Sequence, residues 1–510
     1  MRTVAVQGVS AAQQELFRFL LEANKNTGLN ATLRVAGGWV RDTLLCIPSH
    51  DIDMTVETPP GVPELITGEK FAASLRDYQA SLNIPVHSLS VIKTNPDKSK
   101  HIETATMVVF GTPLEFCHLR SDEYCDSSRV PMTRRGTPLE DAIRRDFTVN
   151  ALFYNLHTQL VEDYCGGLED LRNGVLRCPL PPRQTFLDDP LRLLRGVRFA
   201  GQLGFAIDDS VLSSASSEIL TALERKVSRE RIGIEWAKML SLLRPHMCLD
   251  YLERMGVLRA IILQEFWMKK VRGKPTTELE KTRPLCSTDD SREFALMWGL
   301  TKVLVPLVAM PDNLLYLPVK EHRVVANMFI IGASFYSEIP DDAVGEYIHA
   351  WAVNGLKQPV STSLALRALL KAYRCACCVQ LEELVVAAKQ AEGQDRDHLF
   401  DMFAALADRA IPCDMLPLVI ASALVAQSPL KWDSVEALLP FLEGAVEALR
   451  RDKVLLHSAI TPLPIKANEL PSLLGIEAKE IGGTLNRMRR FIVHHPNATT
   501  GEILAHLARR

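Results

Sequence analysis

A Gly-Gly turn is followed closely by two aspartates that are one residue apart. Gly37 and Gly38 come after a β-like run, residues 32–35, and before residues that can begin a helix. Because glycine carries no Cβ, this turn lets backbone N–H groups come close to a phosphate. Asp51 and Asp53 stand at i and i+2, so on a strand both carboxylates point from one face. Such a pair suits Mg²⁺ and substrate phosphates, which predicts nucleotidyl transfer.

The elements that must position these residues alternate between strands and helices in the first part of the chain. Residues 104–110 and 114–119 read as two strands joined by a Gly-Thr-Pro turn, and residues 16–21 have helical spacing. Alternation of this kind predicts an α+β head with a mixed sheet and helices. A proline cluster at residues 179–182 marks its end. From about Asp188 onward the spacing is helical without a convincing strand, so an all-α neck, body and tail are expected.

Five segments together resemble the motifs of one enzyme family. The first has the form of motif A of the polymerase β-like nucleotidyltransferases, and all five resemble motifs A to E of the class II tRNA nucleotidyltransferases, the CCA-adding enzymes, in their eukaryotic sequence type. The five segments are residues 36–53, 144–152, 163–177, 188–200 and 227–240. The resemblance implies a catalytic head over residues 1–176, a helical neck with the nucleotide-base template over 177–245, a helical body over 246–455, and a tRNA-contacting tail over 456–510.

The resemblance also implies the reaction. Such an enzyme adds CCA to the 3′ end of tRNA from CTP and ATP without a nucleic-acid template, releases pyrophosphate, and uses Mg²⁺, with two ions expected. The implied partners are tRNA and the two nucleotides, with no required protein partner and no membrane. Full CCA addition, CC-only addition and A-only addition are all compatible with these motifs. A poly(A) polymerase of the same superfamily is the alternative enzyme and differs in whether CTP is used. A non-catalytic RNA-binding protein on this fold is the alternative from another class.

Arginines of the motif B segment are expected to bind the nucleotide. Arg144 and Arg145 can meet phosphate oxygens bidentately, and Asp146 can accept a hydrogen bond from a ribose hydroxyl. Arg41, in the Arg-Asp pair after the glycine turn, is placed in the same nucleotide-binding set. The competing interpretation is an ordinary amphipathic helix start with surface arginines. The motif C segment, in contrast, is expected to act through the geometry of its glycine turn.

The motif D segment carries the expected base template. Asp189-Pro190 has the form of a helix N-cap followed by proline at the first helical position, and Arg192, Arg195 and Arg198 recur every three residues. In the family an Asp and an Arg of this motif pair with the incoming base, and the resemblance assigns these roles to Asp189 and Arg192. Arg195 and Arg198 lie further along, nearer where a triphosphate or a helix-packing partner would be, and they are placed in the same nucleotide-binding set. A carboxylate accepts hydrogen bonds and a guanidinium donates them. Cytosine and adenine present an amine donor beside a ring-nitrogen acceptor, which fits this pair, whereas uracil and guanine would place acceptor against acceptor and donor against donor. The competing interpretation is a capped helix with a solvated arginine side.

A third carboxylate usually completes the metal site in this superfamily. Glu115 lies on a predicted strand that could pair beside the strand of Asp53, and it stands where class II enzymes more often have aspartate. The alternatives are Glu103 and an exposed acidic strand residue without a catalytic role. The expected catalytic set is therefore Asp51, Asp53 and Glu115, with Asp51 and Asp53 as metal ligands.

Composition limits how RNA can bind. The 510 residues carry a formal net charge of −3 at pH 7 and are 47% hydrophobic and 23% charged, which is ordinary for a folded protein. RNA must therefore bind a local basic surface. The tail offers one, made of Lys479, Arg487, Arg489 and Arg490. No uninterrupted apolar run is long enough to span a membrane. Eleven scattered cysteines fit reduced thiols, so an intracellular location is expected, in cytoplasm, nucleus or mitochondrion.

Overall fold

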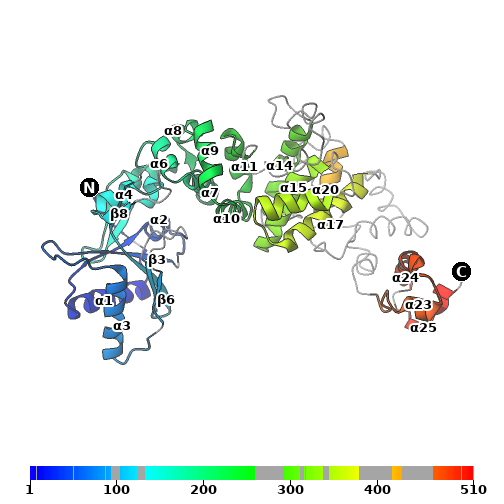
Figure 1. The fold of residues 1–510 in the computed structure, drawn as a ribbon, viewed down its shortest axis with the longest axis horizontal. Coiled ribbons are helices and arrows are strands. Elements are labelled where there is room, and N and C mark those ends of the chain that lie inside the picture. The colour runs from blue at the N-terminus through cyan, green and yellow to red at the C-terminus, as the bar shows by residue number, and fades with distance from the viewer. Residues whose placement is uncertain are drawn as a thin grey trace. The chain divides into compact units, whose positions relative to one another are not determined.

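The computed structural model of the protein divides into two compact units, Met1–Ser228 and Arg229–Arg510. The residues described are 1–6, 8–49, 51–86, 88–92, 104–123, 132–258, 292–309, 315, 317–336, 344–377, 416–427, 463–495 and 497–508 (Figure 1). The limit between the units lies within the predicted neck. The domain limits proposed from the sequence stay predictions.

The first unit contains all of the strands described in the chain. Its strands are β1 (Arg2–Ala5), β2 (Thr32–Ala36), β3 (Ile52–Glu57), β4 (Ser90–Ile92), β5 (Thr104–Val109), β6 (Thr112–His118), β7 (Arg120–Glu123), β8 (Met132–Arg135), β9 (Phe153–Asn155), β10 (Leu160–Asp163), β11 (Val175–Leu176) and β12 (Ala206–Ile207). Its helices are α1 (Ala11–Asn26), α2 (Gly38–Leu44), α3 (Gly68–Ser81), α4 (Pro138–Ile143), the 3₁₀ turn η2 (Thr148–Asn150), α5 (Gly167–Asn173), α6 (Pro182–Asp188), α7 (Leu191–Leu203), α8 (Asp209–Ser213) and α9 (Ser217–Lys226).

An eight-stranded sheet forms the centre of the head. Its order is β1-β10-β9-β2-β3-β6-β5-β4, and β3 and β6 run parallel while the other neighbours run antiparallel. The alternate residues Leu33, Val35, Met54 and Val56 of the central strands are buried. Helix α3 packs on β5 and β6, and α1 packs on α3 (Figure 1). The predicted α+β head with a mixed sheet is confirmed.

The strands expected on either side of a Gly-Thr-Pro turn are present as β5 and β6. Phe110 and Gly111 make the turn, with φ of 49° and 75°, while Thr112 and Pro113 already belong to β6. A two-residue hairpin turn matches the twist of its strands when both residues have positive φ, and glycine adopts this without strain. The strands were therefore predicted correctly, whereas the turn was placed too far along the chain.

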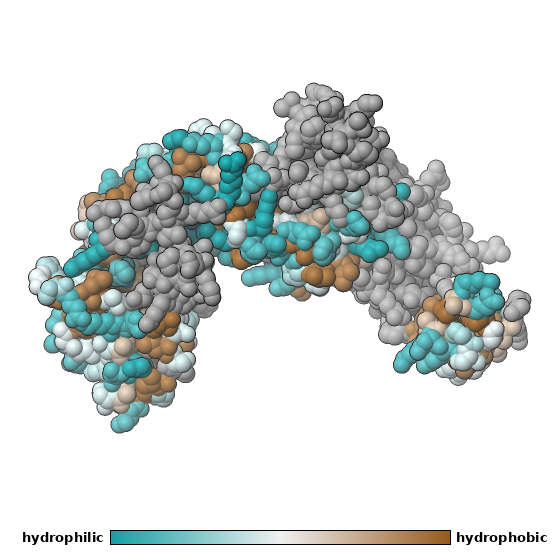
Figure 2. Space-filling model, in the orientation of Figure 1, coloured by the Kyte–Doolittle hydropathy of each residue, from teal (hydrophilic) through white to brown (hydrophobic). Residues whose placement is uncertain are grey.

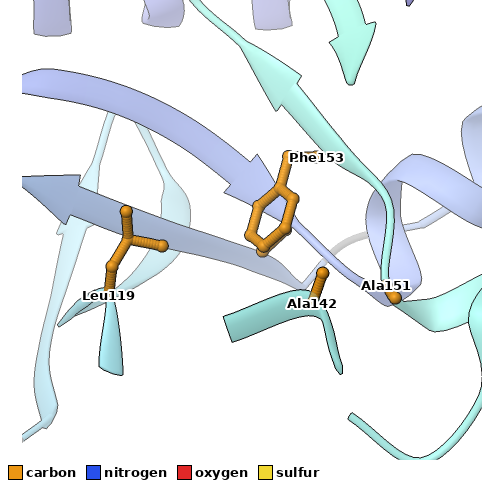
Figure 3. Close-up of a cluster of buried hydrophobic side chains, with 5 residues drawn as sticks. Leu119, Ala142, Ala151 and Phe153 are labelled. Atoms are coloured by element: carbon orange, nitrogen blue, oxygen red, sulfur yellow. The ribbon is translucent and has the colours of Figure 1, made fainter. Parts of the chain in front are cut away.

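A small apolar cluster joins the sheet to the segment that carries the motif B arginines. It consists of Ala36 at the end of β2, Leu119 after β6, Ala142 in α4, and Ala151 and Phe153 around the start of β9 (Figure 3). All five side chains are buried. Because alanine side chains are small, the short helix α4 can lie close to the sheet. The cluster thus holds the end of α4 beside the glycine turn.

Helix α7 begins with the motif D sequence and packs as its apolar spacing predicts. Leu191, Leu194 and Val197 are buried. A Cβ at Gly196 would come within 2.6 Å of the Phe147 ring, so the absence of a side chain lets this ring pack directly on α7. One expectation after residue 188 was wrong, because β12 pairs in parallel with β11. Two residues are too short to produce a period-2 pattern.

Every element described in the second unit is helical. They are α10 (Arg229–Leu240), α11 (Pro245–Arg254), α14 (Arg292–Ala309), α15 (Lys320–Tyr336), α16 (Val344–Ile348), the π-helix η4 (His349–Gly355), α17 (Val360–Cys377), α20 (Leu416–Gln427), α23 (Leu470–Leu474), the 3₁₀ turn η6 (Ala478–Glu480), α24 (Ile481–His494) and α25 (Thr500–Ala508). No helix in the described ranges is long and apolar enough to cross a bilayer. On the described face of the molecule in Figure 2, apolar side chains lie in separate patches among hydrophilic ones.

The tail helices have a small core of their own. Ile465, Leu470, Met488, Ile503 and Leu507 are buried together. These residues come from the segment before α23 and from α23, α24 and α25. The tail is therefore a packed helical element, as the apolar spacing of its sequence predicts.

Candidate nucleotide-binding site

A pocket of about 490 Å³ opens in the first unit, where the glycine turn, the segment after α4 and helix α7 come together. Six arginines and five aspartates are among its lining residues, so it is strongly polar and suited to a charged ligand. It is lined by Gly37, Gly38, Trp39, Arg41, Asp42, Ser49, Asp51, Asp53, Arg144, Arg145, Asp146, Asn150, Asp189, Arg192, Arg195, Arg198, Phe199 and Gln202. Of the residues predicted for the head and neck, the structure brings all except Glu115 to this lining.

The glycine turn lies between β2 and α2, as the sequence predicts. Gly37 has φ 72° and ψ −126°, a conformation that side chains disfavour, and Gly38 begins α2. A Cβ at Gly37 would lie 2.9 Å from Nη1 of Arg145, whereas one at Gly38 would come no closer than 3.8 Å to Arg41. Gly37 is therefore required both by its backbone conformation and by the arginine that lies against it.

Replacing the first of these glycines should harm the pocket far more than replacing the second. We expect Gly37→Ala to lower the free energy of unfolding by about 1–3 kcal/mol and to weaken nucleotide binding, because the strained backbone and Arg145 must both shift. Gly38→Ala is the matched control and should leave both properties near wild type. Thermal melts and a CTP titration of the two variants measure this. Equal effects of the two substitutions would contradict the account.

The three predicted carboxylates lie on neighbouring strands. Asp53 is in β3, Asp51 directly precedes this strand, and Glu115 in β6 is the register partner of Asp53. The strand pairing that was expected from the sequence is thus present, while Glu103 lies outside the described residues. Asp53 opens to the pocket, yet the surrounding protein restricts its hydration. This dehydration, together with Asp51, raises the pKa of Asp53, and Arg145 partly offsets the rise.

Glu115 carries the same electrostatic signature. Restricted hydration, then Asp53 and Asp51, raise its pKa. Carboxylates that repel one another are stabilised by a cation, so the charge arrangement fits Mg²⁺. Among the described residues no three His, Cys, Asp or Glu side chains converge into a complete metal site.

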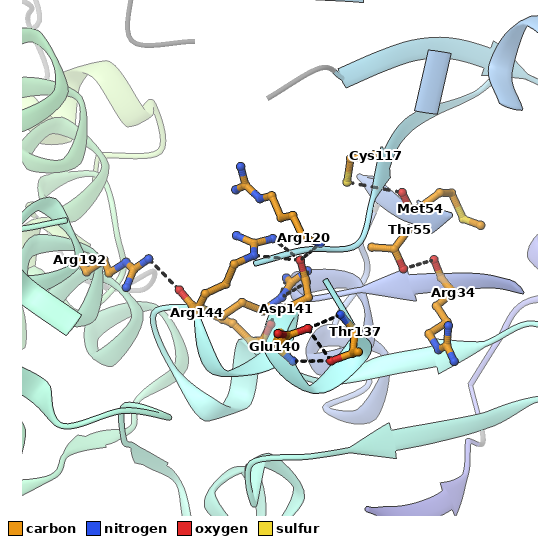
Figure 4. Close-up of polar contacts among 12 residues, drawn as sticks. Arg34, Met54, Thr55, Cys117, Arg120, Thr137, Glu140, Asp141, Arg144 and Arg192 are labelled. Atoms are coloured by element: carbon orange, nitrogen blue, oxygen red, sulfur yellow. Dashed lines mark hydrogen bonds and ion pairs between the residues drawn. The ribbon is translucent and has the colours of Figure 1, made fainter. Parts of the chain in front are cut away.

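A buried aspartate that the sequence analysis missed holds both motif B arginines. Asp141 in α4 is 1% exposed, and its two oxygens accept from Nε of Arg144 at 2.9 Å and from Nη2 of Arg145 at 2.9 Å (Figure 4). Burial acts to raise the pKa of Asp141, but Arg145 and Arg144 outweigh it and lower the pKa. The signal was present in the sequence, since Asp141 in the last turn of α4 precedes the arginines by three and four residues. The surface-arginine interpretation of this segment does not hold.

A second network fixes the predicted ribose acceptor. Oδ2 of Asp146 accepts from Nε of Arg195 at 2.8 Å, and its Oδ1 accepts from Nδ2 of Asn150 at 3.0 Å. Oδ1 of Asn150 accepts in turn from Nη1 of Arg41 at 2.6 Å. Burial acts to raise the pKa of Asp146, but Arg195, Asn150 and Arg192 together outweigh it and lower the pKa. Asn150 was missed from the sequence because its partner Arg41 is 109 residues away.

The two residues of the expected base template are held at the start of α7. Oδ1 of Asp189 accepts from the Leu191 N–H at 3.2 Å, so it caps the helix, which begins one residue later than predicted. Nη2 of Arg192 donates to the carbonyl oxygen of Arg144 at 2.7 Å (Figure 4) and Nη1 to that of Thr185 at 3.4 Å. Both side chains line the pocket. Capping and base recognition are thus compatible, because the carboxylate has a second oxygen.

The tail residues predicted to contact tRNA divide into three kinds. Nη2 of Arg487 donates to the Leu507 carbonyl oxygen at 3.0 Å, which ties α24 to the end of α25. Lys479 is exposed and forms an ion pair of 2.8 Å with Glu477. The side chains of Arg489 and Arg490 lie outside the described residues. Arg487 therefore also has a structural role in the tail, and a role for all four residues in RNA binding stays a prediction.

Comparison with known proteins agrees with the sequence motifs. Residues 33–177 match the Poly A polymerase head domain family. The mitochondrial CCA tRNA nucleotidyltransferase of Saccharomyces cerevisiae is 46% identical over 242 residues, which are 46% of this chain and 42% of that protein. The sequence likeness to tRNA nucleotidyltransferases therefore lies in the first half of the chain. The chain spans less than half of the length of this yeast relative.

Solved structures extend the likeness of fold beyond the family match. A CCA-adding enzyme in complex with CTP superposes with a TM-score of 0.56 at 19% identity and covers 99% of this chain and 98% of that chain. The CCA-adding enzyme of Thermotoga maritima in complex with tRNA gives a TM-score of 0.55 at 18% identity and covers 99% of each chain. At this level of identity the likeness establishes the fold.

Proposed function

We propose that this protein is a tRNA nucleotidyltransferase that adds CCA to the 3′ end of tRNA from CTP and ATP. The observation that carries the proposal is the pocket in which the Asp51/Asp53 pair, the motif B arginines and the motif D residues meet. The match of residues 33–177 to the Poly A polymerase head domain supports the proposal. So do the similar proteins that are named as CCA tRNA nucleotidyltransferases.

In the proposed reaction the pocket binds the triphosphate and the base of the incoming nucleotide. The terminal 3′ hydroxyl of tRNA attacks the α-phosphorus of CTP or ATP, the new P–O bond forms, and the bond to the β-phosphate oxygen breaks. Pyrophosphate leaves, and the hydroxyl proton passes to solvent. Arg144 and Arg145, which Asp141 holds side by side, supply positive charge for the triphosphate. Asp189 and Arg192 select the base.

Asp51 and Asp53 are the residues that would hold Mg²⁺, with Glu115 beside them. Bound there, Mg²⁺ would favour the ionised attacking hydroxyl and offset the charge of the pyrophosphate. Dehydration first, and then the neighbouring carboxylates, raise the pKa values of Asp53 and Glu115. A cation bound there would stabilise the ionised carboxylates, which supports this assignment.

The poly(A) polymerase alternative differs in its use of CTP, and the alternative of a non-catalytic RNA-binding protein predicts no incorporation at all. We expect labelled CMP and AMP to be added to tRNA that lacks CCA, in a reaction with each nucleotide alone and then with both. Incorporation of AMP without any use of CTP would favour the poly(A) polymerase. Absence of incorporation with every nucleotide would contradict an enzymatic function.

Removal of charge from the tail tests tRNA binding separately from catalysis. We expect the double variant Arg489→Ala/Arg490→Ala to weaken tRNA binding and to flatten its dependence on salt. The log–log slope should fall by up to about 0.7–0.9 for each phosphate that the tail no longer neutralises. The control removes the exposed charges of Lys70 and Arg76 from α3. Filter binding at several salt concentrations measures the tRNA affinity and its salt dependence for the tail variant, the control and wild type. The same slope in the tail variant and wild type would count against the proposal.

The location of the protein follows from its proposed substrate. We propose that it acts inside the cell, where tRNA is matured, in cytoplasm, nucleus or mitochondrion. The yeast relative is named as mitochondrial, which supports the last of these as one site. Fractionation of cells that express a tagged chain would assign the compartment.

A further inference from the structure

One aromatic ring in the nucleotide pocket is surrounded by arginines. The guanidinium carbon of Arg198 lies 4.1 Å from the centre of the Phe199 ring, that of Arg41 lies at 5.0 Å, and that of Arg195 lies at 5.3 Å. All three distances are within the range of cation–π attraction, which extends to about 6 Å. All four residues line the pocket.

These arginines come from two elements that the ring joins. Arg195 and Arg198 belong to α7 with Phe199 itself, whereas Arg41 belongs to α2. The ring also meets Phe147 edge to face at 6.2 Å, which fixes its plane from the side of the head core. Phe199 is therefore the point where the helix with the glycine turn and the helix with the motif D residues meet.

Two of the three guanidinium groups have little access to water. Arg41 is 4% exposed and Arg198 is 9% exposed. Buried cations need hydrogen-bond partners, and Asp42 and Asn150 provide them for Arg41 while Gln202 provides one for Arg198 at 3.0 Å. Like charges that lie around one point repel each other. Asp42 and Asp146 form ion pairs with Arg41 and Arg195 at 2.7 and 2.8 Å. The negative face of the aromatic ring offsets the remaining repulsion without adding a further anion to the pocket.

We propose that Phe199 is a positioning residue for the triphosphate: its ring gathers Arg41, Arg195 and Arg198 and keeps their positive charge available to the nucleotide. The inference rests on the proposed function of the pocket. A leucine of similar volume would fill the space but would not attract the guanidinium groups. A ring whose π-electron density is withdrawn by fluorine keeps the shape and loses the attraction.

The experiment replaces Phe199 in the full-length chain by phenylalanine with one, two and three ring fluorines, and measures Kd for CTP and for CMP without tRNA. We expect CTP affinity to fall stepwise by about 10-fold over the series, the scale of a partly buried cation–π pair, while CMP affinity changes little. Phe199→Leu should resemble the trifluorinated ring. The matched control is Phe71, a buried ring that meets the Phe116 ring at 5.3 Å and lies over no arginine in the described ranges.

The outcomes separate this inference from the function on which it rests. A graded decrease in CTP affinity at position 199 and none at position 71 supports the positioning role. CTP affinity that stays constant across the series, or that falls equally with CMP or at position 71, overturns it while leaving the proposed function intact. If the wild-type chain itself binds no CTP and incorporates no CMP into tRNA, the proposed function has failed instead.

Discussion

Asp51→Asn and Asp53→Asn should each reduce CCA addition by about 10³-fold or more, because Mg²⁺ contributes several kcal/mol of transition-state stabilisation and each 1.36 kcal/mol is a factor of ten. Asparagine keeps the size of the side chain and removes the charge that would hold the ion. The alanine variants should lose as much activity. Binding of tRNA should survive in all four, since neither residue belongs to the basic tail.

A second measurement distinguishes a metal ligand from a residue that only supports the fold. The wild-type chain with CTP should gain thermal stability when Mg²⁺ is added, and this gain should be absent in Asp53→Asn. Without Mg²⁺ the same variant should be at least as stable as wild type, because dehydration, with a smaller contribution from Asp51, raises the pKa of Asp53 and so disfavours a charge at this position. The control is Asp77→Ala, which removes an exposed aspartate of α3. If Asp51→Asn and Asp53→Asn both incorporate nucleotide at more than a few per cent of the wild-type rate, these residues are not the Mg²⁺ ligands.

The sequence predicted the parts of the site whose spacing is local. Gly37 at a strand–helix turn and the i,i+2 aspartates each follow from a few neighbouring residues. A capping contact from Asp189 to α7 also follows, although the N-cap position itself falls on Pro190. The position of Glu115 on a strand also followed, because two short strands flank a recognisable turn, and the structure pairs this strand with that of Asp53. Contacts across distant segments did not follow. Nothing in the local pattern links Asn150 to Arg41.

Burial was the other property that local spacing misjudged. The competing interpretation of motif D placed Arg198 on a solvated arginine side, yet Arg198 is 9% exposed, lies over the Phe199 ring and donates to the Gln202 side chain. Arginine periodicity along a helix gives the direction of each side chain but not what packs on it from another element. In the second unit the sequence also fails to show which helices pack on one another. The sequence of α20 is apolar on all sides, so it indicates burial without indicating which element packs against it.

Asp189→Ala should reduce the discrimination in kcat/KM against UTP and GTP by about 10- to 100-fold. This is the scale of one or two unpaired buried groups. The overall rate should fall as well, because cytosine and adenine lose a partner. Arg192→Ala should have a similar effect, and the double variant should show less than the sum, since both residues act on one base. Arg192 is anchored on the carbonyl oxygens of Arg144 and Thr185, which limits its adaptation to a wrong base.

The helix cap made by Asp189 offers a second explanation for any effect of the alanine variant, and Asp189→Asn separates the two. Its amide oxygen can still accept from the Leu191 N–H, so stability should stay near wild type. Its NH₂ group then presents a donor to the exocyclic amine of cytosine or adenine, and discrimination against UTP and GTP should weaken despite the intact cap.

Thr67→Ala removes only the cap of α3 and should cost about 1 kcal/mol of stability without changing base choice. The measurements are kcat/KM for all four nucleotides beside a melting curve. Base preference that stays unchanged in Asp189→Asn, with reduced stability in Asp189→Ala, would limit Asp189 to a capping role and refute the template.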